Sequence, residues 1–336
     1  MKIESIAEAL VQQVVVDSPS LASPPRHFTT KSPVDFWSSP AVIAPNNFVY
    51  KSLSNWAFNI AVGCSHACRF CYVPSAATIK QAAKLAEYGV NDPDAEWGDY
   101  VLLRPWDEKK FLTSLRAAEN TRRSQLKPDG NRAVIYCSTT DPYQPLERKY
   151  QVTRQCLEVF ARYDDLDLLV VQTRSQLAER DLPLMLQIPY AWLSITIETN
   201  DQVYLKGLKG GPPLSTRWEL VRTASARGVP TQITISPCLR YTGVEEFGQQ
   251  LLHSGAHRLV VDSVTDGDGA QGERTARSPF AKAEPDWANT SHAHQLYHYL
   301  LGKAVGTGIS LGWSNAGFCG IPLSLKTTEN SRLQQD

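Results

Sequence analysis

The stretch GCSHACRFCY, residues 63–72, places three cysteines within eight residues, at Cys64, Cys68 and Cys71. The chain has seven cysteines, and the other four stand alone, at Cys137, Cys156, Cys238 and Cys319. Three thiols this close in sequence do not suit an ordinary disulfide framework. They indicate thiolates that bind a metal or a cluster in a reducing compartment.

Short runs of apolar and β-branched residues recur along the chain and predict strands buried on both faces of a sheet. The six runs are WAFNIAVG (56–63), RAVIYCST (132–139), DLLVVQT (167–173), WLSITIE (192–198), TQITISP (231–237) and HRLVVDS (257–263). Helical patterns alternate with them, as in STRWELVRTASARG at 215–228. There, Thr216 and Glu219 have capping-box spacing, and Gly228 predicts the end of the helix.

Six alternating strand and helix units predict an α/β fold, a partial (β/α)6 barrel around a parallel sheet. We assign residues 51–264 to this barrel. Residues 1–50 contain Pro- and Ser-rich segments such as DSPSLASPPRHF and predict an extended N-terminal arm. Residues 265–336 include Gly, His and aromatic residues, and we expect a C-terminal extension that covers the active-site mouth.

The charge balance limits the choice of partners. Lys and Arg together number 34, as do Asp and Glu, in a chain of 336 residues. A neutral chain has no global field for nucleic acid, so any contact with DNA needs a local patch. The N-terminal segment MKIESIAEALVQQVVVDSPS is amphipathic, and no apolar run approaches the roughly 18 residues that span a bilayer. We therefore expect a cytoplasmic protein without a membrane partner.

Two kinds of site compete for the three cysteines. A structural zinc site needs a fourth ligand, and although His66 lies between the first two cysteines, such sites usually take two pairs of ligands from separate turns. An iron–sulfur cube held by three cysteines leaves its fourth iron open to a ligand that is not protein. The second reading explains why no fourth cysteine lies nearby. The loop also follows the first predicted strand, where barrel chemistry is expected.

The spacing C-x3-C-x2-C, with the aromatic Phe70 before the last cysteine, resembles the motif of the radical S-adenosylmethionine (radical SAM) superfamily. The resemblance implies that Cys64, Cys68 and Cys71 hold a [4Fe-4S] cluster whose open iron binds SAM. An external electron donor of the flavodoxin or ferredoxin type would reduce the cluster. SAM cleavage would then give a 5′-deoxyadenosyl radical that abstracts hydrogen from the substrate, with the protein orienting these groups and excluding water.

The segment CSTTDPYQPLERKYQVTRQCLE, residues 137–158, resembles the branch of this superfamily that includes spore photoproduct lyase and related proteins. The resemblance runs from about residue 55 to 264. It implies that Asp141 binds the SAM amino group, with Ser138 and Thr140 beside it, since a carboxylate beside an ammonium is a favourable contact. The alternative is that Asp141 only starts a turn at Pro142.

Two later strands supply further candidates for SAM binding. Arg174 stands where relatives usually have lysine and implies a contact with the SAM carboxylate, although an ordinary ion pair is the alternative. Ser194 and Glu198 share one face with Thr196 by period-two alternation, and we expect them near the SAM ribose or carboxylate. A hydrogen-bond network in the core is equally compatible with that pattern. Phe70 is expected to pack on adenine.

Two residues are candidates for the radical chemistry itself. Cys137 matches the position of a hydrogen-donor cysteine in spore photoproduct lyases, although here one extra Ser/Thr separates it from Asp141. Tyr72 matches a tyrosine proposed there as a radical relay, but its companion position holds Phe70, which excludes a relay of two tyrosines. The alternatives are a buried thiol acting as a small hydrophobe and a tyrosine that packs the barrel.

The sequence leaves the substrate open among four readings. A small molecule such as a nucleoside or a sugar nucleotide is favoured over repair of a DNA lesion, because the chain is neutral. Insertion of sulfur from a second cluster would need ligands such as Cys137, Cys238 and Cys319, whose isolated spacing matches no cluster motif. The fourth reading is an iron–sulfur protein without catalysis.

Overall fold

The computed structural model describes residues 34–75, 79–126, 131–163, 166–209, 211–314 and 317–322. The amphipathic N-terminal segment and the first 33 residues of the predicted arm lie outside the described residues, as do residues 323–336 of the predicted extension. Among the described residues, no helix is both long enough and apolar enough to cross a bilayer.

The main sheet has eight strands in the order β11-β10-β9-β8-β7-β6-β3-β2. All neighbouring pairs are parallel except β2 with β3, which are antiparallel. The edge strands β2 and β11 do not pair within the described ranges, so the sheet forms a partial barrel, as predicted. The strands are β2 (Ile43–Pro45), β3 (Trp56–Phe58), β6 (Ala133–Tyr136), β7 (Leu168–Thr173), β8 (Ala191–Thr196), β9 (Thr231–Ile235), β10 (Arg258–Val261) and β11 (Ser310–Trp313).

Five of the six predicted strands are confirmed, but the first one divides in two. Its first half is β3, and its second half, β4 (Ala61–Gly63), belongs to a smaller sheet with β1 (Val34–Phe36) and β5 (Val101–Leu103). The chain leaves the main sheet at Asn59. The side chain of Asn59 accepts a hydrogen bond from the backbone N–H of Thr139 at 2.9 Å, so it bonds to the segment after β6. The change of sheet aims the following cysteine loop toward the ends of the parallel strands.

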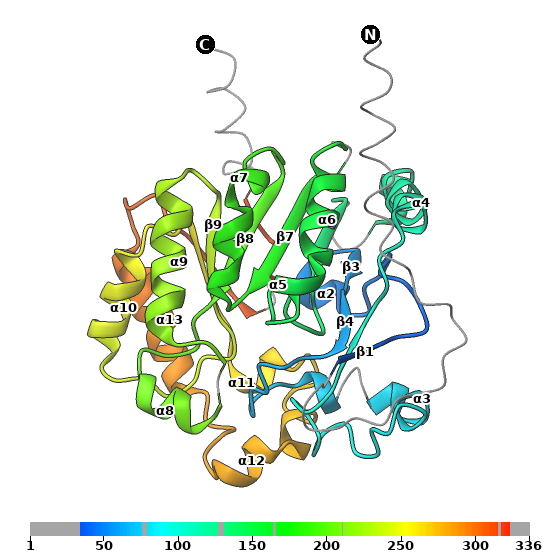
Figure 1. The fold of residues 1–336 in the computed structure, drawn as a ribbon. Helices are drawn as coiled ribbons and strands as arrows, with labels where there is room; N and C mark the ends of the chain where they lie inside the picture. The colour runs from blue at the N-terminus through cyan, green and yellow to red at the C-terminus, as the bar shows by residue number, and fades with distance from the viewer. Residues whose placement is uncertain are drawn as a thin grey trace, which may run out of the picture.

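The helices surround the sheet and cluster at one of its ends (Figure 1). Those around the outside include α6, α9, α10 and α13, whereas α3, α8, α11 and α12 gather at one end. The longer helices are α4 (Glu108–Glu119), α6 (Val152–Phe160), α9 (Leu214–Ala226), α10 (Val244–Leu252) and α13 (Ser291–Lys303). The shorter ones are α2 (Val49–Ser52), α3 (Ala82–Ala86), α5 (Glu147–Tyr150), α7 (Leu182–Met185), α8 (Gln202–Gly207), α11 (Val264–Gly267) and α12 (Pro279–Ala283). Single 3₁₀ turns are η2 (Ile79–Gln81), η3 (Arg123–Gln125), η4 (Gln176–Asp181) and η5 (Thr275–Arg277).

The predicted start of α9 is wrong, whereas its predicted end is confirmed. The helix begins at Leu214, so Thr216 lies inside it, and the Thr216 hydroxyl donates to the carbonyl of Pro213 at 2.9 Å. Pro213 at the N-cap makes no side-chain bond to this helix; instead, the side-chain oxygen of Gln202 accepts from the Leu214 N–H at 2.6 Å. Gly228 follows the helix with φ +81°, a left-handed conformation that favours glycine.

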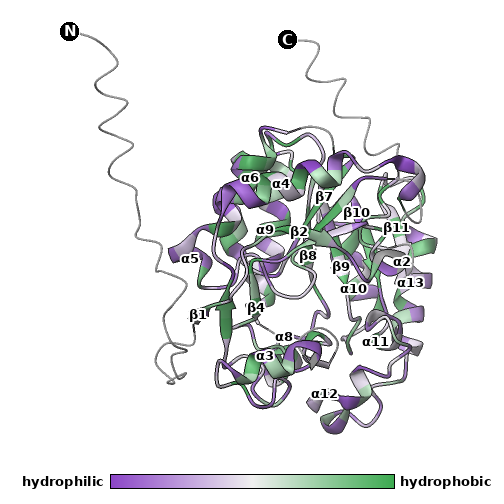
Figure 2. Cartoon of the chain, turned by 90° about the vertical axis from the view of Figure 1, so that its right-hand side faces the viewer, coloured by the Kyte–Doolittle hydropathy of each residue, from purple (hydrophilic) through white to green (hydrophobic). Residues whose placement is uncertain are grey.

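The core lies between the parallel strands and the surrounding helices. Figure 2 shows hydrophilic residues on the outer faces of the helices and largely hydrophobic strands at the centre. Strands β6 and β8 are buried at every residue, which explains why they read as continuous apolar runs.

Strand β11 comes from the predicted C-terminal extension and adds a seventh parallel strand next to β10. Its sequence, SLGW, has no apolar run and is only partly buried, so it carries no strand signal. The Arg258 side chain lies against Gly312 in this strand: a Cβ atom at Gly312 would lie 2.7 Å from Arg258 Nη2, so a larger residue would displace the buried guanidinium.

Candidate functional site

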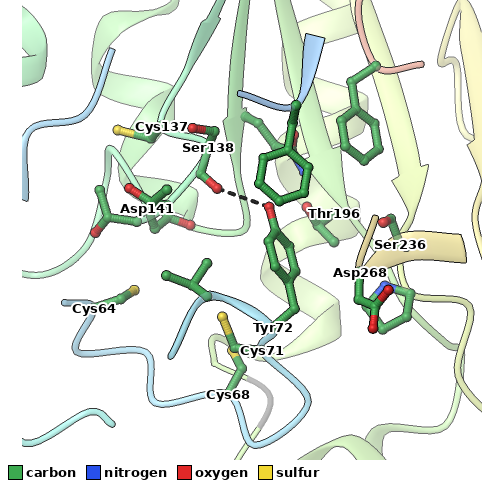
Figure 3. A pocket seen from close by; sticks show the side chains of 18 of the residues that line it. Cys64, Cys68, Cys71, Tyr72, Cys137, Ser138, Asp141, Thr196, Ser236 and Asp268 are labelled. Atoms are coloured by element: carbon green, nitrogen blue, oxygen red, sulfur yellow. Dashed lines mark hydrogen bonds between the residues drawn. The ribbon is translucent and has the colours of Figure 1, made fainter. Parts of the chain in front are cut away.

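A cavity opens at the end of the sheet where the parallel strands finish (Figure 3). It encloses about 1100 Å³ when its open mouth is included. Most of the predicted site residues line it, namely Cys64, Cys68, Phe70, Cys71, Tyr72, Cys137, Ser138, Thr140, Asp141 and Arg174. Ser194 and Glu198 lie behind the lining rather than in it.

The ring of Tyr72 divides this cavity into two sides (Figure 3). We define the cysteine side by Cys64, Cys68, Cys71 and Asp141, which lie to one side of the ring in Figure 3, with Arg174 bonded to Asp141. We define the far side by Ser236 and Asp268 on the other side of the ring, with Lys51, which shares Asp262 with Ser236, and the lining residues Phe48 and Phe318. The Tyr72 hydroxyl donates a hydrogen bond of 3.2 Å to the backbone carbonyl of Ser138, which holds the ring upright between the two sides. The sequence predicted the cysteine side and missed the far side.

The cysteine loop turns sharply as it leaves β4. Gly63 has φ +91°, and a Cβ atom there would lie 2.3 Å from the carbonyl oxygen of Tyr100, so only glycine fits. Turn hydrogen bonds then connect Ala67 N–H with the Cys64 carbonyl at 3.3 Å and Cys71 N–H with the Cys68 carbonyl at 3.1 Å. These turns bring all three thiols to the cavity wall.

Gln144 fastens the cysteine loop to the segment after β6, and sequence reasoning missed this role. Its side-chain oxygen accepts from the backbone N–H of Ser65 at 3.0 Å, and its amide donates to Thr140 Oγ1 at 2.8 Å. Thr140 in turn donates to the carbonyl of Gly63 at 2.7 Å. Gln144 is fully buried, so this chain of bonds is shielded from water. In the sequence, this role is indicated only by the position of the glutamine shortly after Asp141, a predicted SAM ligand.

The buried position of the three thiols favours ionisation only when a positively charged group binds to them. Burial raises the pKa of Cys64 well above its usual range and that of Cys71 to about 12. The pKa of Cys68 is also raised by burial, with Arg174 acting in the opposite direction. Buried thiols like these become thiolates when a metal ion supplies the compensating charge.

The arrangement does not suit a single ion. No three His, Cys, Asp or Glu side chains among the described residues converge to hold one metal ion. A cluster places a separate iron at each thiolate. The donor set, three thiols on one cavity wall, therefore fits a [4Fe-4S] cluster better than the zinc site considered from the sequence.

Asp141 is more fully engaged by the protein than the sequence suggested. Its Oδ1 accepts from the Tyr143 N–H at 2.8 Å and from Thr173 Oγ1 at 2.7 Å, and its Oδ2 accepts from the Arg174 N–H at 3.0 Å. Burial opposes ionisation, but His66, Thr173 and Arg174 hold the pKa of Asp141 at about 2. The hydrogen bond from the Tyr143 N–H forms the turn that the sequence offered as the alternative role of Asp141. The bonds from Thr173 and Arg174 connect the end of β6 to the end of β7.

Arg174 belongs to a buried arrangement of charges. Its Nη2 lies 2.8 Å from Oε1 of Glu198, and Nη1 of Arg217 lies 2.6 Å from Oε2 of the same carboxylate. Burial opposes ionisation of Glu198, yet the two arginines lower its pKa. Glu198 therefore orients Arg174 from behind the cavity wall. Arg174 Nε is buried and has no hydrogen-bond partner among the described residues, so one donor at the cavity remains for an anionic group.

Ser194 and Thr196 share a face of β8, as predicted, but they lie at different depths. Thr196 lines the cavity. Ser194 Oγ accepts from Gln232 Nε2 at 3.1 Å and lies 3.4 Å from Thr234 Oγ1, within the core hydrogen-bond network considered as the alternative. Contact of Ser194 with SAM stays a prediction.

Cys137 lines the cavity at the end of β6, and its backbone is unusual. It has φ +64°, a left-handed conformation that is uncommon for a residue with a side chain. The Cys137 N–H donates to the Phe58 carbonyl at 2.6 Å, which holds the residue in this conformation. Ser138 beside it lies 3.5 Å from Asn59 Nδ2. Strained positions of this kind cluster at functional sites.

Phe70 faces the C-terminal extension. Its ring makes an edge contact with Phe280 of α12, with centroids 6.4 Å apart. Phe70 is buried but still lines the cavity, so one edge is covered by α12. The predicted packing on adenine is untested. The contact shows part of the extension against the cysteine loop at the cavity mouth.

The far side is assembled from distant segments. Lys51 Nζ donates to Asp262 Oδ1 at 2.6 Å and to Ser314 Oγ at 2.9 Å, and Ser236 donates to Asp262 Oδ2 at 3.0 Å. These contacts join α2 to the ends of β9, β10 and β11. Phe48 then contacts Tyr72, with ring centroids 5.8 Å apart.

Cys238 and Cys319 do not join Cys137 at a second cluster site. Cys238 is buried in the main core, and Cys319 is buried in a separate apolar cluster with Ile135 and Val170. Neither lines the cavity. Cys156 is fully buried in α6, as expected for a core residue.

Comparison with known proteins agrees with this site. A family described as the radical SAM superfamily matches residues 58–247. An uncharacterised protein of Acidianus two-tailed virus is 30% identical over 217 residues, which cover 62% of this chain and 66% of that protein. An uncharacterised protein of Methanocaldococcus jannaschii is 24% identical over 188 residues, covering 55% of this chain and 61% of that protein. The chain thus spans less than two thirds of these relatives.

Solved structures of spore photoproduct lyase variants have a similar fold. One matches with a TM-score of 0.56 at 11% identity and covers 83% of this chain and 80% of that chain. Another, with bound AdoMet and dinucleoside spore photoproduct, has a TM-score of 0.53 at 12% identity and covers 78% and 77%. The family match extends over more than half of the chain and includes the cysteine loop. The chain belongs to the radical SAM superfamily.

Proposed function

We propose that this enzyme abstracts a hydrogen atom from a small molecule bound on the far side of the cavity, with the cluster and SAM on the cysteine side. The observation that carries the proposal is the division of one cavity by Tyr72. Three thiols lie on one side, and a lining of aromatic, hydroxyl and charged groups lies on the other. A substrate on the far side would be close to the reaction yet separated from the thiols by the ring.

The cysteine side supplies the groups that would hold the cofactors. Cys64, Cys68 and Cys71 would hold the cluster, which together with SAM supplies a 5′-deoxyadenosyl radical when both are bound. The unpartnered Nε of Arg174 would donate to the SAM carboxylate, while Glu198 keeps the guanidinium in place. Asp141 has three donors already and would act mainly by positioning Arg174 through its backbone N–H.

In this proposal, the neighbours of Asp141 support the SAM site indirectly or position other residues. Thr140 is committed to the bonds that hold the cysteine loop, and it would support the SAM site indirectly. Ser138 presents its carbonyl to Tyr72, so it would position the dividing ring. Phe70 would pack on adenine from the cavity wall.

The far side favours a substrate without phosphate groups. Among the described lining residues, the cations are Lys51 and Arg174, and each has a carboxylate partner, Asp262 and Glu198. A phosphate would therefore compete with an existing ion pair. Phe48, Tyr72 and Phe318 offer aromatic faces for a planar ring. Of the small molecules considered, a nucleoside suits this lining better than a sugar nucleotide.

Two residues near the dividing ring are candidates for returning a hydrogen atom to the product. Cys137 lines the cavity in a strained conformation, which supports its role as the donor. Tyr72 lies between the two sides, which supports a relay through its phenolic oxygen. Its bond to the Ser138 carbonyl would also be explained by a purely positioning role.

The test is a reaction under anaerobic conditions. Protein reconstituted with iron and sulfide, reduced with dithionite and mixed with SAM, should release 5′-deoxyadenosine, and nucleosides should raise the rate when they occupy the far side. Deuterium from a labelled substrate should appear in the 5′-deoxyadenosine. Release that is stimulated only by damaged DNA would contradict the proposed substrate class.

A further inference from the structure

The floor of the cavity is formed by neighbouring strands of the main sheet. Ile135 of β6, Gln172 of β7 and Thr196 of β8 line the cavity there. Gln172 pairs with Ser194 in the register of β7 and β8, so it lies one step further from the mouth than Thr196. Every other residue of β7 is buried, whereas Gln172 is only partly covered. The uncovered part of its side chain therefore faces the cavity that it lines.

The carboxamide of Gln172 makes no hydrogen bond with another described residue. Asn46, a second carboxamide in the lining, is fully engaged by comparison. Its Nδ2 donates to the hydroxyls of Ser52 and Ser54, each at 2.7 Å, and its Oδ1 accepts from the Phe48 N–H at 2.9 Å. Of these two carboxamides, Gln172 is the one that keeps both its donor and its acceptor for a ligand.

The hydroxyl of Thr139 is also without a bond to another described residue in the lining. A hydroxyl rotates and can either donate or accept, so it discriminates poorly between ligands. A carboxamide presents a C=O acceptor and an NH₂ donor side by side in one plane, in a fixed order. Gln172 therefore has the greater power to select a ligand.

A ligand that covers the floor must replace the water at this carboxamide. If either polar group is buried without a partner, binding loses free energy, so a ring without complementary groups is rejected. The complementary edge carries a donor next to an acceptor. Two kinds of ring have such an edge: a lactam, with N–H beside C=O, and an amidine, with an amino group beside a ring nitrogen. Glutamine reads adenine in DNA through two bonds of this kind.

We propose that Gln172 determines substrate specificity by forming two hydrogen bonds with the edge of a planar ring that carries an adjacent donor and acceptor. The inference rests on the proposed function, because it narrows the class of ring that the cavity binds. Ile135, which lines the floor from the neighbouring strand, has no polar group that competes for this edge. Phe318 lines the same cavity and offers a face on which the ring can pack.

The experiment measures nucleoside binding by equilibrium dialysis, using the reconstituted full chain with an oxidised cluster and saturating SAM. SAM keeps its own adenosine site filled, and the oxidised cluster prevents turnover. Inosine and uridine carry lactams, and 1-methylinosine and 3-methyluridine lack the N–H donor. Adenosine carries an amidine, and purine riboside lacks the amino group. At least one parent nucleoside should bind roughly 10- to 100-fold more tightly than its analogue, and that pair identifies the edge.

Two substitutions test whether Gln172 is the cause of this discrimination. Gln172→Met keeps the length of the side chain and removes both polar groups, so the discrimination should disappear. Gln172→Glu presents two acceptors and should shift the preference toward guanosine, whose ring N–H and amino group are adjacent donors. The matched control is Gln250→Met, at an exposed position of α10, which should keep the wild-type discrimination. Iron content and melting temperature check folding, and if Gln172→Met does not fold, the result with Gln172→Glu decides.

The binding assay requires no cleavage of SAM, which separates this inference from the proposed function. If dithionite with SAM gives no 5′-deoxyadenosine while Gln172 still sets the discrimination, the proposed function fails and the binding assignment stands. The inference is overturned if the wild type binds none of these nucleosides, treats the members of every pair alike, or keeps its discrimination in Gln172→Met. It is also overturned if Gln172→Met weakens the binding of SAM alone, because the carboxamide would then belong to the SAM site.

Discussion

The two sides of the cavity are built in opposite ways. The cysteine side rests on a contiguous loop, residues 63–72, fastened by Gln144 and Thr140 from the next strand's end. The far side joins Lys51, Ser236, Asp262 and Ser314, which lie on separate segments across more than 260 positions. The comparison teaches that cofactor binding can be carried by a short motif, whereas the substrate surface depends on the whole fold.

The largest expected effect is on the cysteine side. Replacing Cys64, Cys68 and Cys71 together with alanine should abolish cluster binding and all release of 5′-deoxyadenosine, because it removes every thiol of the cysteine loop. Iron analysis after reconstitution checks this, with about four irons per chain expected in the wild type. Cys156→Ala, in the core of α6, is the matched control and should retain its iron. Full iron loading of the triple variant would show that the cluster lies elsewhere.

A second substitution tests whether the two sides of the cavity are independent of each other. Lys51→Met leaves Asp262 buried without its cation, which should lower the free energy of unfolding by about 3–5 kcal/mol. Urea unfolding followed by tryptophan fluorescence measures this. Adding Asp262→Asn should recover most of the loss. Iron content should stay at the wild-type value in both variants, and loss of the cluster would mean that the sides are not independent.

Arg174 tests the anion contact on the cysteine side. Arg174→Ala removes a charged donor at the cavity and should weaken SAM binding by about 10- to 100-fold, equivalent to about 1.5–3 kcal/mol. Equilibrium dialysis with the reconstituted protein measures the Kd. Arg174→Lys restores the charge and should recover part of the affinity. If Arg174→Ala binds SAM as tightly as the wild type, Arg174 only pairs with Glu198 and does not contact SAM.

The smallest expected effect concerns Glu147, which follows Gln144 in the segment behind the cysteine side. Burial raises the pKa of Glu147 from 4.5 to about 7, although bonds from Arg180 and two backbone N–H groups oppose the shift. A raised pKa means that the folded state binds the proton more tightly. The stabilisation is full below about pH 4.5 and is lost as pH rises through about 7.

The corresponding measurement compares unfolding at two pH values. The wild type should lose about 1 kcal/mol between about pH 6 and about pH 8 through this group. Glu147→Gln cannot titrate, so its loss over the same interval should be smaller by that amount. Parallel curves for the two proteins would show that Glu147 ionises normally in the folded state.

The fold was largely predictable because buried parallel strands carry a strong local signal. The exceptions have physical causes. The first run divides because Asn59 bonds to the segment after β6, a contact between residues 80 positions apart. Strand β11 carries no apolar run, and its place beside β10 depends on packing around Arg258.

The candidate site was predictable where the residues follow strands and not where they meet through tertiary structure. Cys64, Asp141 and Arg174 were found because each directly follows a predicted strand. Lys51 and Asp262 were missed because neither has a motif, and their ion pair exists only after α2 packs against the end of β10. Glu198 lies beyond the end of β8, and its burial behind Arg174 could not be read from alternation alone.

The division of the cavity at Tyr72 is tested most directly by a crystal structure of the anaerobically reconstituted protein with SAM. The account predicts a cluster on Cys64, Cys68 and Cys71, the SAM carboxylate within hydrogen-bonding distance of Arg174, and open space beside Lys51 and Ser236. A SAM molecule that lies against Lys51 and Ser236 and fills the far side would contradict it.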